Sequence, residues 1–363
     1  MSNLTETAYY TRKALKYGSI LLVVFLILRG FIIASLSWWK KVNPPPPPPA
    51  TLAFGKIPSI NFPDSGTKPA FYPKLETVDN KLPEFPVNAS VYFIPQQTLN
   101  LFTLERAKGW AKQIGFINEP EKTDDYNYVF KTPGVNQTVL RLNILLGNFS
   151  LTYNYQNDLT LVGLSNAPDK NQAIAEAKGF LQKAGVFTPD LASGYQEVVY
   201  FRFNPPNLEE AISLSEADFT QVNFFRSEIE KLKVLPSNPK KANVSFLISA
   251  SDNPEKRILT VNYTHFPISQ ETSATYPLKK IDLAWQELQN NQAFLANFGQ
   301  NFDGQVVVRK IYLAYFDPPD EQRFLEPIYV FEGDRDFLAY VSALDPKFTE
   351  ALSPIENSPI PSQ

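Results

Sequence analysis

One long apolar run dominates the pattern of hydrophobic and polar positions. Residues 18–37 read GSILLVVFLILRGFIIASLS, and Arg29 is their one charged residue. Twenty helical residues span about 30 Å, which is the thickness of a hydrocarbon core. The pattern predicts a single transmembrane helix over 18–39 in a cell membrane, with a cytoplasmic tail at 1–17 and the rest outside the cytoplasm. A cleaved signal peptide is the alternative.

Arg29 falls near the middle of this run, where a charge costs about 2.5–3.5 kcal/mol to insert. Small residues follow it at helical spacing, namely Gly30, Ala34 and Ser37. That spacing is typical of close contact between membrane helices. Two explanations stay open. Either these four residues contact a partner helix, or the Arg29 side chain reaches the membrane surface by snorkelling.

Prolines mark the segment that follows. Six of them stand in a row at 44–49, and such a run favours a polyproline II rod of about 19 Å. Further prolines alternate with aromatic and aliphatic residues up to residue 86. Residues 40–99 are therefore expected to be a proline-rich spacer and an extended segment.

Helical periodicity returns twice with similar residues, AKGW at 107–110 and AKGF at 177–180. The first helix is expected to begin at Thr103 as N-cap and to end before Gly115, because glycine suits a helix C-terminus. The second has a capping-box pattern of Asp and Gln at 169 and 172, and Gly185 as its stop. A looser third copy occupies 281–288.

Runs of β-type residues follow each helix. Apolar residues alternate with polar ones, as in Val244, Phe246 and Ile248, which predicts strands with one buried and one solvated face. Gly333-Asp334 predicts a hairpin turn. The predicted fold class is α+β, with repeated modules of a helix on an antiparallel sheet.

This pattern divides the region after the spacer into four parts. The predicted boundaries are a first α+β module at 100–157, a second at 158–270, a third at 271–345, and a flexible proline-containing tail at 346–363.

The composition excludes several kinds of bond and binding site. The chain has no cysteine, one histidine and a net charge of −3. Disulfides, cysteine-bound zinc and a basic surface for nucleic acid are thereby excluded, and the lack of disulfides favours a bacterial envelope protein. His265 alone cannot form a metal cluster, and no nucleophile motif accompanies it. We expect no catalytic residue, no metal and no cofactor.

The stretch 271–345 carries a recognisable order of apolar and aromatic positions. It contains YPL at 276–278, an Ala-Trp helix, the strand IYLAY at 311–315, the run EPIYVFEG at 326–333, and AYVSA at 339–343. This order resembles PepSY-type modules and related single-pass regulators of a bacterial cell-wall sensor kinase. The resemblance implies a non-catalytic role that restrains a kinase or peptidase partner.

The predicted function is that of a membrane-anchored envelope protein with a binding or regulatory ectodomain. Its expected partners are the lipid bilayer and a protein of the membrane or envelope, which an exposed sheet edge could bind by strand addition. Two alternatives stay open: a cell-envelope hydrolase using a carboxylate pair, and a structural scaffold of a membrane assembly.

Overall fold

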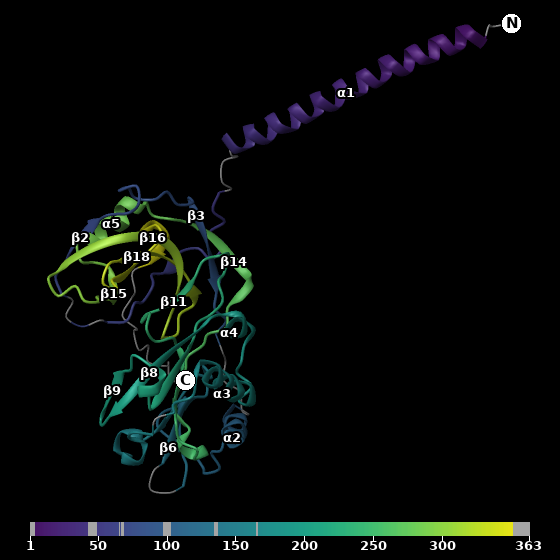
Figure 1. Cartoon of the computed structure of the whole chain (residues 1–363). Helices are drawn as coiled ribbons and strands as arrows, with labels where there is room; N and C mark the ends of the chain where they lie inside the picture. Colours follow the sequence, from purple (N-terminus) through teal and green to yellow (C-terminus); the bar gives the residue numbers. More distant parts are fainter. Residues whose placement is uncertain are drawn as a thin grey trace, which may run out of the picture. The chain divides into compact units, whose positions relative to one another are not determined.

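The structure is a computed structural model that describes residues 4–42, 49–64, 66, 69–96, 103–133, 137–164 and 166–350. The chain divides into two compact units, and the second begins at Ala50. The first unit contains one long helix, α1 (Leu4–Val42) (Figure 1).

The membrane anchor predicted at 18–39 is wrong. Within the described residues, no helix combines the length and the apolar character that crossing a bilayer requires. The apolar run is part of a longer helix, which continues through Arg12, Lys13 and Lys16 and carries Arg29. Charged positions therefore lie inside the helix instead of flanking it. The predicted single-pass topology and cell-membrane localisation depend on this anchor and are corrected with it.

The second unit is built mainly of strands. Its α-helices are α2 (Thr103–Gln113), α3 (Lys170–Lys183), α4 (Pro189–Ser193) and α5 (Ile281–Gln289). Its described strands are β1 (Ile57–Pro58), β2 (Tyr72–Leu75), β3 (Asn88–Phe93), β4 (Glu121–Lys122), β5 (Asn127–Lys131), β6 (Thr138–Asn143), β7 (Phe149–Tyr153), β8 (Gln196–Asn204), β9 (Asn207–Glu210), β10 (Phe219–Phe224), β11 (Val234–Pro236), β12 (Val244–Ser249), β13 (Ile258–Tyr263), β14 (Ser269–Pro277), β15 (Phe294–Asn297), β16 (Gln305–Asp317), β17 (Phe324–Leu325), β18 (Pro327–Gly333), β19 (Leu338–Ser342) and β20 (Thr349–Glu350). Short 3₁₀ turns are η1 (Tyr155–Asn157), η2 (Leu159–Leu161), η3 (Leu214–Glu216), η4 (Pro254–Lys256) and η5 (Pro346–Phe348).

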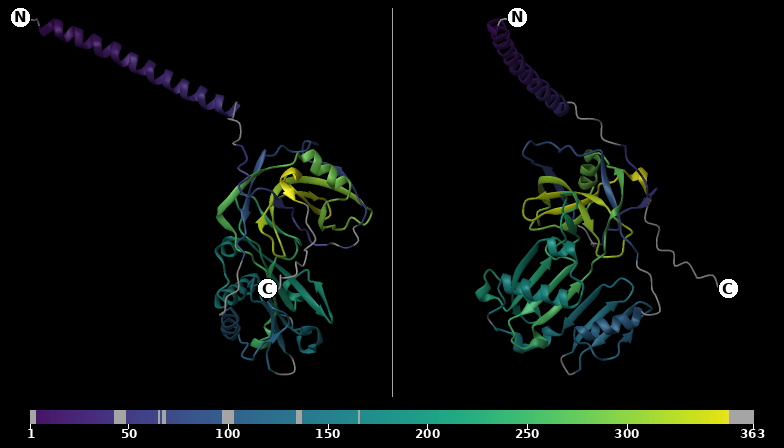
Figure 2. Two further views of the ribbon diagram at one scale, coloured as in Figure 1. Left: turned by 180° about the vertical axis from the view of Figure 1, so that it is seen from behind. Right: turned by 90° about the vertical axis from the view of Figure 1, so that its right-hand side faces the viewer.

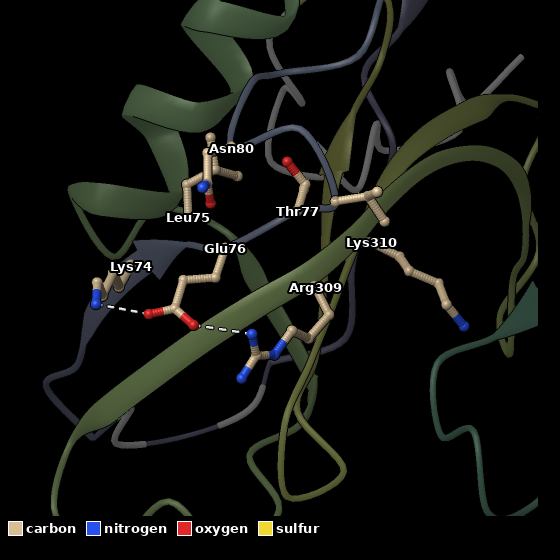
Figure 3. Close-up of a pocket in the computed structure, with 8 residues that line it drawn as sticks. Lys74, Leu75, Glu76, Thr77, Asn80, Arg309 and Lys310 are labelled. Carbon is tan, nitrogen blue, oxygen red and sulfur yellow. Dashed lines mark hydrogen bonds and ion pairs between the residues drawn. The ribbon is translucent and has the colours of Figure 1, made fainter.

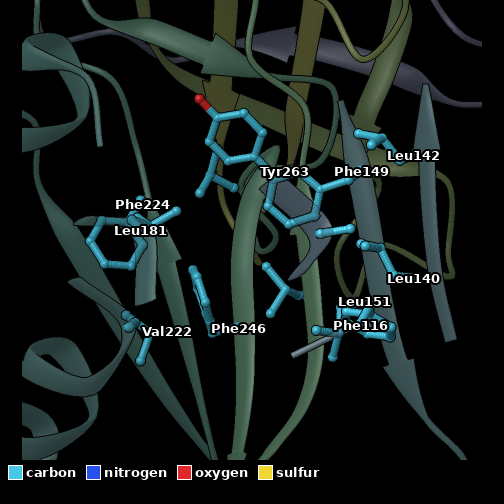
Figure 4. Packing of buried hydrophobic residues seen from close by; sticks show 14 of the residues in the cluster. Phe116, Leu140, Leu142, Phe149, Leu151, Leu181, Val222, Phe224, Phe246 and Tyr263 are labelled. Atoms are coloured by element: carbon cyan, nitrogen blue, oxygen red, sulfur yellow. The ribbon is translucent and has the colours of Figure 1, made fainter. Parts of the chain in front are cut away.

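Nine antiparallel strands form the larger sheet, in the order β4-β5-β6-β7-β13-β12-β10-β8-β9. Helices α2 and α3 cover one face of it (Figure 2). Their buried residues, such as Ala111 and Leu181, share one core with residues from the strands β5–β7, β10, β12 and β13. Figure 4 shows Leu181 and Phe224 on one side of this core and Tyr263 beside Phe149, on which its ring stacks, on the other.

Local sequence signals place these two helices correctly. Helix α2 begins at Thr103, and Gly115 follows it with a φ of +108°. Asp169 caps α3, because its side chain accepts a 2.9 Å hydrogen bond from the Gln172 amide. Gly185 ends α3 with a φ of +69°, a conformation that glycine adopts without strain.

A second sheet contains six strands around β16. The order is β11-β16-β18-β19-β15, and β2 also pairs with β16. Both β2 and β11 run parallel to β16, while β18 runs antiparallel. Helix α5 packs on this sheet through Ala284 and Leu288. The remaining strands form a three-stranded sheet, β14-β3-β17, and a parallel pair of β1 with β20.

The predicted α+β class with repeated modules is wrong. The proposed modules 100–157 and 158–270 share one sheet, because β7 pairs with β13 across more than a hundred residues. The proposed third module at 271–345 is incomplete, because its sheet takes β2 and β11 from outside that range. Strand β12 has both faces buried, so its alternating residues do not mark a solvated face. The unit is a β-rich fold with few helices.

The segment expected to be an extended spacer takes part in the folded unit. Its part at 50–96 supplies β1, β2 and β3 to three different sheets. Pro44 to Pro48, expected to form the rod, lie outside the described residues, and so does the tail from residue 351 onward.

Candidate functional site

Strand β16 is the longest strand described, and its two edges differ. Strand β18 pairs with one edge from Val308 to Tyr315. On the other edge, β2 pairs with 305–308 and β11 with 315–317. Residues 309–314 therefore have no neighbouring strand on that side, and we call them the edge gap. At 3.3 Å per residue, the gap is about 20 Å long.

A β-bulge causes pairing with β2 to stop. The register with β18 shifts between Val308 and Lys310, which places an extra residue in β16 and rotates the main chain that follows. Before the bulge, the Val308 carbonyl accepts a hydrogen bond from Glu76, at 3.0 Å, in continuation of β2. After the bulge, the order in which successive residues direct their main-chain N–H and C=O groups toward β18 and away from it is reversed.

This alternation decides which main-chain groups face the gap. Phe316 donates its N–H to the Glu326 carbonyl at 3.1 Å, whereas Tyr315 donates to Lys233 on the β11 side at 2.8 Å. Successive residues of a strand point in opposite directions. Ile311 and Leu313 therefore direct their N–H and C=O groups into the edge gap, and no described residue bonds to these N–H groups.

Several residues of β16 are buried both inside and outside the edge gap. Val306 and Val308, covered by β2, are 0% exposed, and Tyr315, covered by β11, is also 0% exposed. Between them, Ile311 and Leu313 are each 8% exposed although their side chains belong to the core. Exposure does not follow the covering strands at every position, because Ala314 inside the gap is 0% exposed and Gln305, which pairs with β2, is exposed.

An open pocket of about 780 Å³ lies at the β2 end of the gap, lined by Lys74, Leu75, Glu76, Thr77, Val78, Asn80, Arg309 and Lys310. Figure 3 shows Lys74 and Arg309 on either side of the Glu76 carboxylate, at 2.6 and 2.8 Å. Arg309 also binds Asp334 at 2.6 Å. The hydrogen bond and charge of Lys74, together with Arg309, lower the pKa of Glu76.

These ion pairs hold the pocket wall in place without filling it. The hydrogen bond from Arg309 lowers the pKa of Asp334, so the carboxylates on both sides of the guanidinium are ionised at neutral pH. Lys310 points away from this group, as Figure 3 shows, and pairs with Glu332 at 3.1 Å. The rim also carries Val78, whose side chain is 99% exposed. The pocket therefore combines fixed charges with an unpaired apolar contact point.

The single histidine belongs to a different place, where the two larger sheets meet. His265 contacts Asp190 of α4 at 2.9 Å, and Arg226 binds the same carboxylate at 2.8 Å. The guanidinium also binds Asp317 of β16 at 3.0 Å and donates to the Phe266 carbonyl at 2.8 Å. One buried arginine thus joins the end of β10 to the end of β16.

The ion pairs of this joint serve to hold the two sheets together. Burial alone would raise the pKa of Asp190, but the hydrogen bond from His265 and the charge of Arg226 outweigh burial and hold that pKa well below its usual range. Asp190 is thus committed to its contacts with Arg226 and His265. Within the described residues, no three histidine, aspartate or glutamate side chains are grouped to hold a metal ion.

The residues predicted to contact a membrane helix belong to α1, in the first unit. Arg29 and Gly30 are exposed on α1, and apart from the chain neighbours and backbone of its own helix no described atom lies within 4 Å of where a Gly30 Cβ would be. The side chains of Ala34 and Ser37 lie outside the described residues.

The sequence reasoning missed both the edge gap and Glu326, a buried carboxyl between β17 and β18. Nothing in the local pattern reveals the gap, because it results from three strand pairings distant in sequence. Glu326 did leave a signal. It is the one charged residue in the run FLEPIYVF at 324–331, where a strand with both faces buried has no solvated position for it.

Comparison with known proteins gives no family for this chain. No family model and no curated protein matches it. Among solved structures, it is similar to an uncharacterized protein from Eubacterium rectale, with 11% sequence identity, 70% of this chain and 82% of that chain covered, and a TM-score of 0.31. A likeness at that score carries no argument. The predicted resemblance of 271–345 to PepSY-type modules gains no support from these comparisons.

Proposed function

We propose that this chain is a non-catalytic binding module that acts through protein contacts and captures an extended segment of a partner at the edge gap. The observation that carries the proposal is the position of Ile311 and Leu313. Their main-chain groups face an edge that is bare for six residues and covered at both ends. An unpaired strand edge binds another extended chain through main-chain hydrogen bonds.

The geometry limits what can bind. Strands β2 and β11 close the gap at both ends, so a whole sheet edge of another molecule is too long to enter. A segment of five residues suffices to pair with both Ile311 and Leu313, since main-chain groups of alternate residues face one neighbour. The partner is therefore an extended peptide segment, and its side chains alternate between the two faces of the sheet.

The pocket at the β2 end adds a side-chain contact. Leu75 and the fully exposed Val78 offer apolar surface beside the ion pairs of Arg309. Exposed apolar residues next to an unpaired edge are typical of interaction surfaces. We expect one apolar side chain of the bound segment to lie against Val78.

The hydrolase alternative is less well supported. It needs two carboxyl groups that face each other across a cleft, one of them able to hold a proton. The two acids beside this pocket, Glu76 and Asp334, each bind Arg309 and have lowered pKa values. Neither is set up as a general acid.

A library of random heptapeptides displayed on phage tests the proposal, with the full chain as target. Peptides that bind are then titrated against two variants of the chain, Val78→Glu and Ile212→Glu. Both positions are 99% exposed, so neither substitution disturbs the core, but only Val78 lies at the edge gap. We expect Val78→Glu to weaken binding about tenfold or more, since an apolar contact of about 1.4 kcal/mol corresponds to that factor, and Ile212→Glu to leave it unchanged.

Two results would overturn the proposal: selected peptides that bind the Val78→Glu chain as tightly as the unchanged chain, or peptides that keep their affinity when alternate amides are N-methylated. The second modification removes the donors that strand pairing needs while it preserves the side chains.

A further inference from the structure

Glu326 occupies a junction between two sheets. It follows β17, which pairs with β3, and precedes β18, which pairs with β16. Its main chain is fixed, because its carbonyl accepts the N–H of Phe316. Its side chain is 4% exposed, and Oε2 has no hydrogen-bond partner among the described residues. A carboxyl group so placed is unusual, since buried polar groups are nearly always paired.

The surroundings offer this carboxyl no compensation. Phe324, two residues earlier on the same face of the chain, belongs to an apolar cluster with Ile57, Val91, Tyr276 and Leu344. The Tyr276 hydroxyl is close enough to respond to the charge of Glu326, but it donates its hydrogen bond to the Gly55 carbonyl at 2.8 Å.

The charged groups on the neighbouring elements are occupied or exposed. Lys279 binds Glu287 at 2.6 Å, and Asp317 binds Arg226. Glu230, which contacts β3, accepts a hydrogen bond from Ser90. Exposed charged residues are Lys56, Glu271, Arg323, Lys347 and Glu350. The half-buried Asp345 accepts a hydrogen bond from the Lys347 amide. None of them contributes to the pKa of Glu326, which burial alone raises well above its usual value of 4.5.

We propose that Glu326 is a proton-dependent lock on the three-stranded sheet β14-β3-β17. While the carboxyl holds its proton, the apolar cluster around it stays closed. When the proton leaves, the anion has no partner in the interior and must reach water, because an isolated charge in an apolar site is strongly disfavoured.

The strand pairing indicates where the structure opens. Strand β17 is held to β3 by only two residue pairs, Phe324 with Phe93 and Leu325 with Tyr92, plus the bond from Ile94 to the Arg323 carbonyl. Strand β18, on the other side of Glu326, has long ladders with β16 and β19. Deprotonation therefore releases β17 from β3 and leaves the six-stranded sheet in place.

The direction of the pH effect follows from linkage. A carboxyl with a raised pKa in the closed state contributes its full stability below 4.5, the value it takes when open. That stability is lost as the pH rises toward the closed-state pKa. In this interval the ratio of open to closed molecules increases about tenfold per pH unit, because opening releases one proton.

Amide hydrogen exchange of the full chain at several pH values tests the lock. After correction for intrinsic rates, we expect the opening constant of the Ile94 amide, which bonds to the Arg323 carbonyl across the β17–β3 contact, to increase about tenfold per pH unit above 4.5. Residues 258–263 of β13 serve as the internal reference and should show no such slope. Glu326→Gln removes the ionisation at nearly constant shape and should abolish the slope, and Glu326→Met does the same if the glutamine variant folds poorly.

The control is Glu321→Gln, which removes an exposed carboxylate from the loop before β17 and should keep the slope. The lock is refuted by a pH-independent opening constant in the unchanged chain, by a slope that persists in both Glu326 variants, or by an equal slope in β13, which would indicate global unfolding.

Discussion

The nine-stranded sheet and the six-stranded sheet protect their edges to different degrees. The nine-stranded sheet ends in β4, a strand of two residues, and in β9, which carries Glu209 and Glu210. Short and charged edge strands discourage pairing with another chain. The six-stranded sheet leaves 309–314 of its longest strand bare, beside an exposed valine. The edges of the nine-stranded sheet discourage pairing with a further strand, whereas the edge gap of the six-stranded sheet leaves room for one.

The largest effect is expected at the joint between the two sheets. Arg226→Met should reduce the free energy of unfolding by about 3–5 kcal/mol, because it leaves the carboxylates of Asp190 and Asp317 without their buried cation. Arg202→Met is the matched control, since Arg202 pairs with Glu216 at the surface and should change stability by less than about 1 kcal/mol.

Urea unfolding measures both variants. Equal losses for Arg226→Met and Arg202→Met would show that the joint adds nothing beyond a surface ion pair. A loss confined to Arg226→Met would establish that the buried ion pairs tie the six-stranded sheet, which carries the edge gap, to the nine-stranded sheet.

A smaller effect tests the protected edge. Glu210→Val removes a charge from β9 and should change the free energy of unfolding by no more than about 0.5 kcal/mol, because the side chain is exposed. The unprotected edge should instead promote self-association, which analytical ultracentrifugation detects. Glu255→Val, an exposed substitution outside any strand, should remain unassociated, and equal association of the two variants would argue against edge protection.

The sequence revealed the parts of this fold that depend on neighbouring residues. Helix α3 has its cap at Asp169, and the turn at Gly333-Asp334 joins β18 to β19, as their local patterns predict. Such signals arise within a few residues of the chain. They need no knowledge of distant partners.

The rest depended on contacts that no local pattern encodes. Pairing of β7 with β13 merged two expected modules, and the arrival of β2 and β11 at one edge of β16 created the gap. The composition of the apolar run around Arg29 predicts a membrane span, whereas the structure places this run within a longer helix. Glu326 could have been found, since a lone acid in an apolar strand predicts either a partner or a proton.

Amide exchange at single-residue resolution along β16 tests the central claim most directly. Tyr312 and Ala314 face β18, and their N–H groups should be protected by that ladder. Ile311 and Leu313 face the edge gap, so their N–H groups should exchange on the order of 100-fold faster in the free protein. A pattern that alternates along the strand is the predicted result. Equal protection of all four amides would show that the edge is already covered, and would contradict the account.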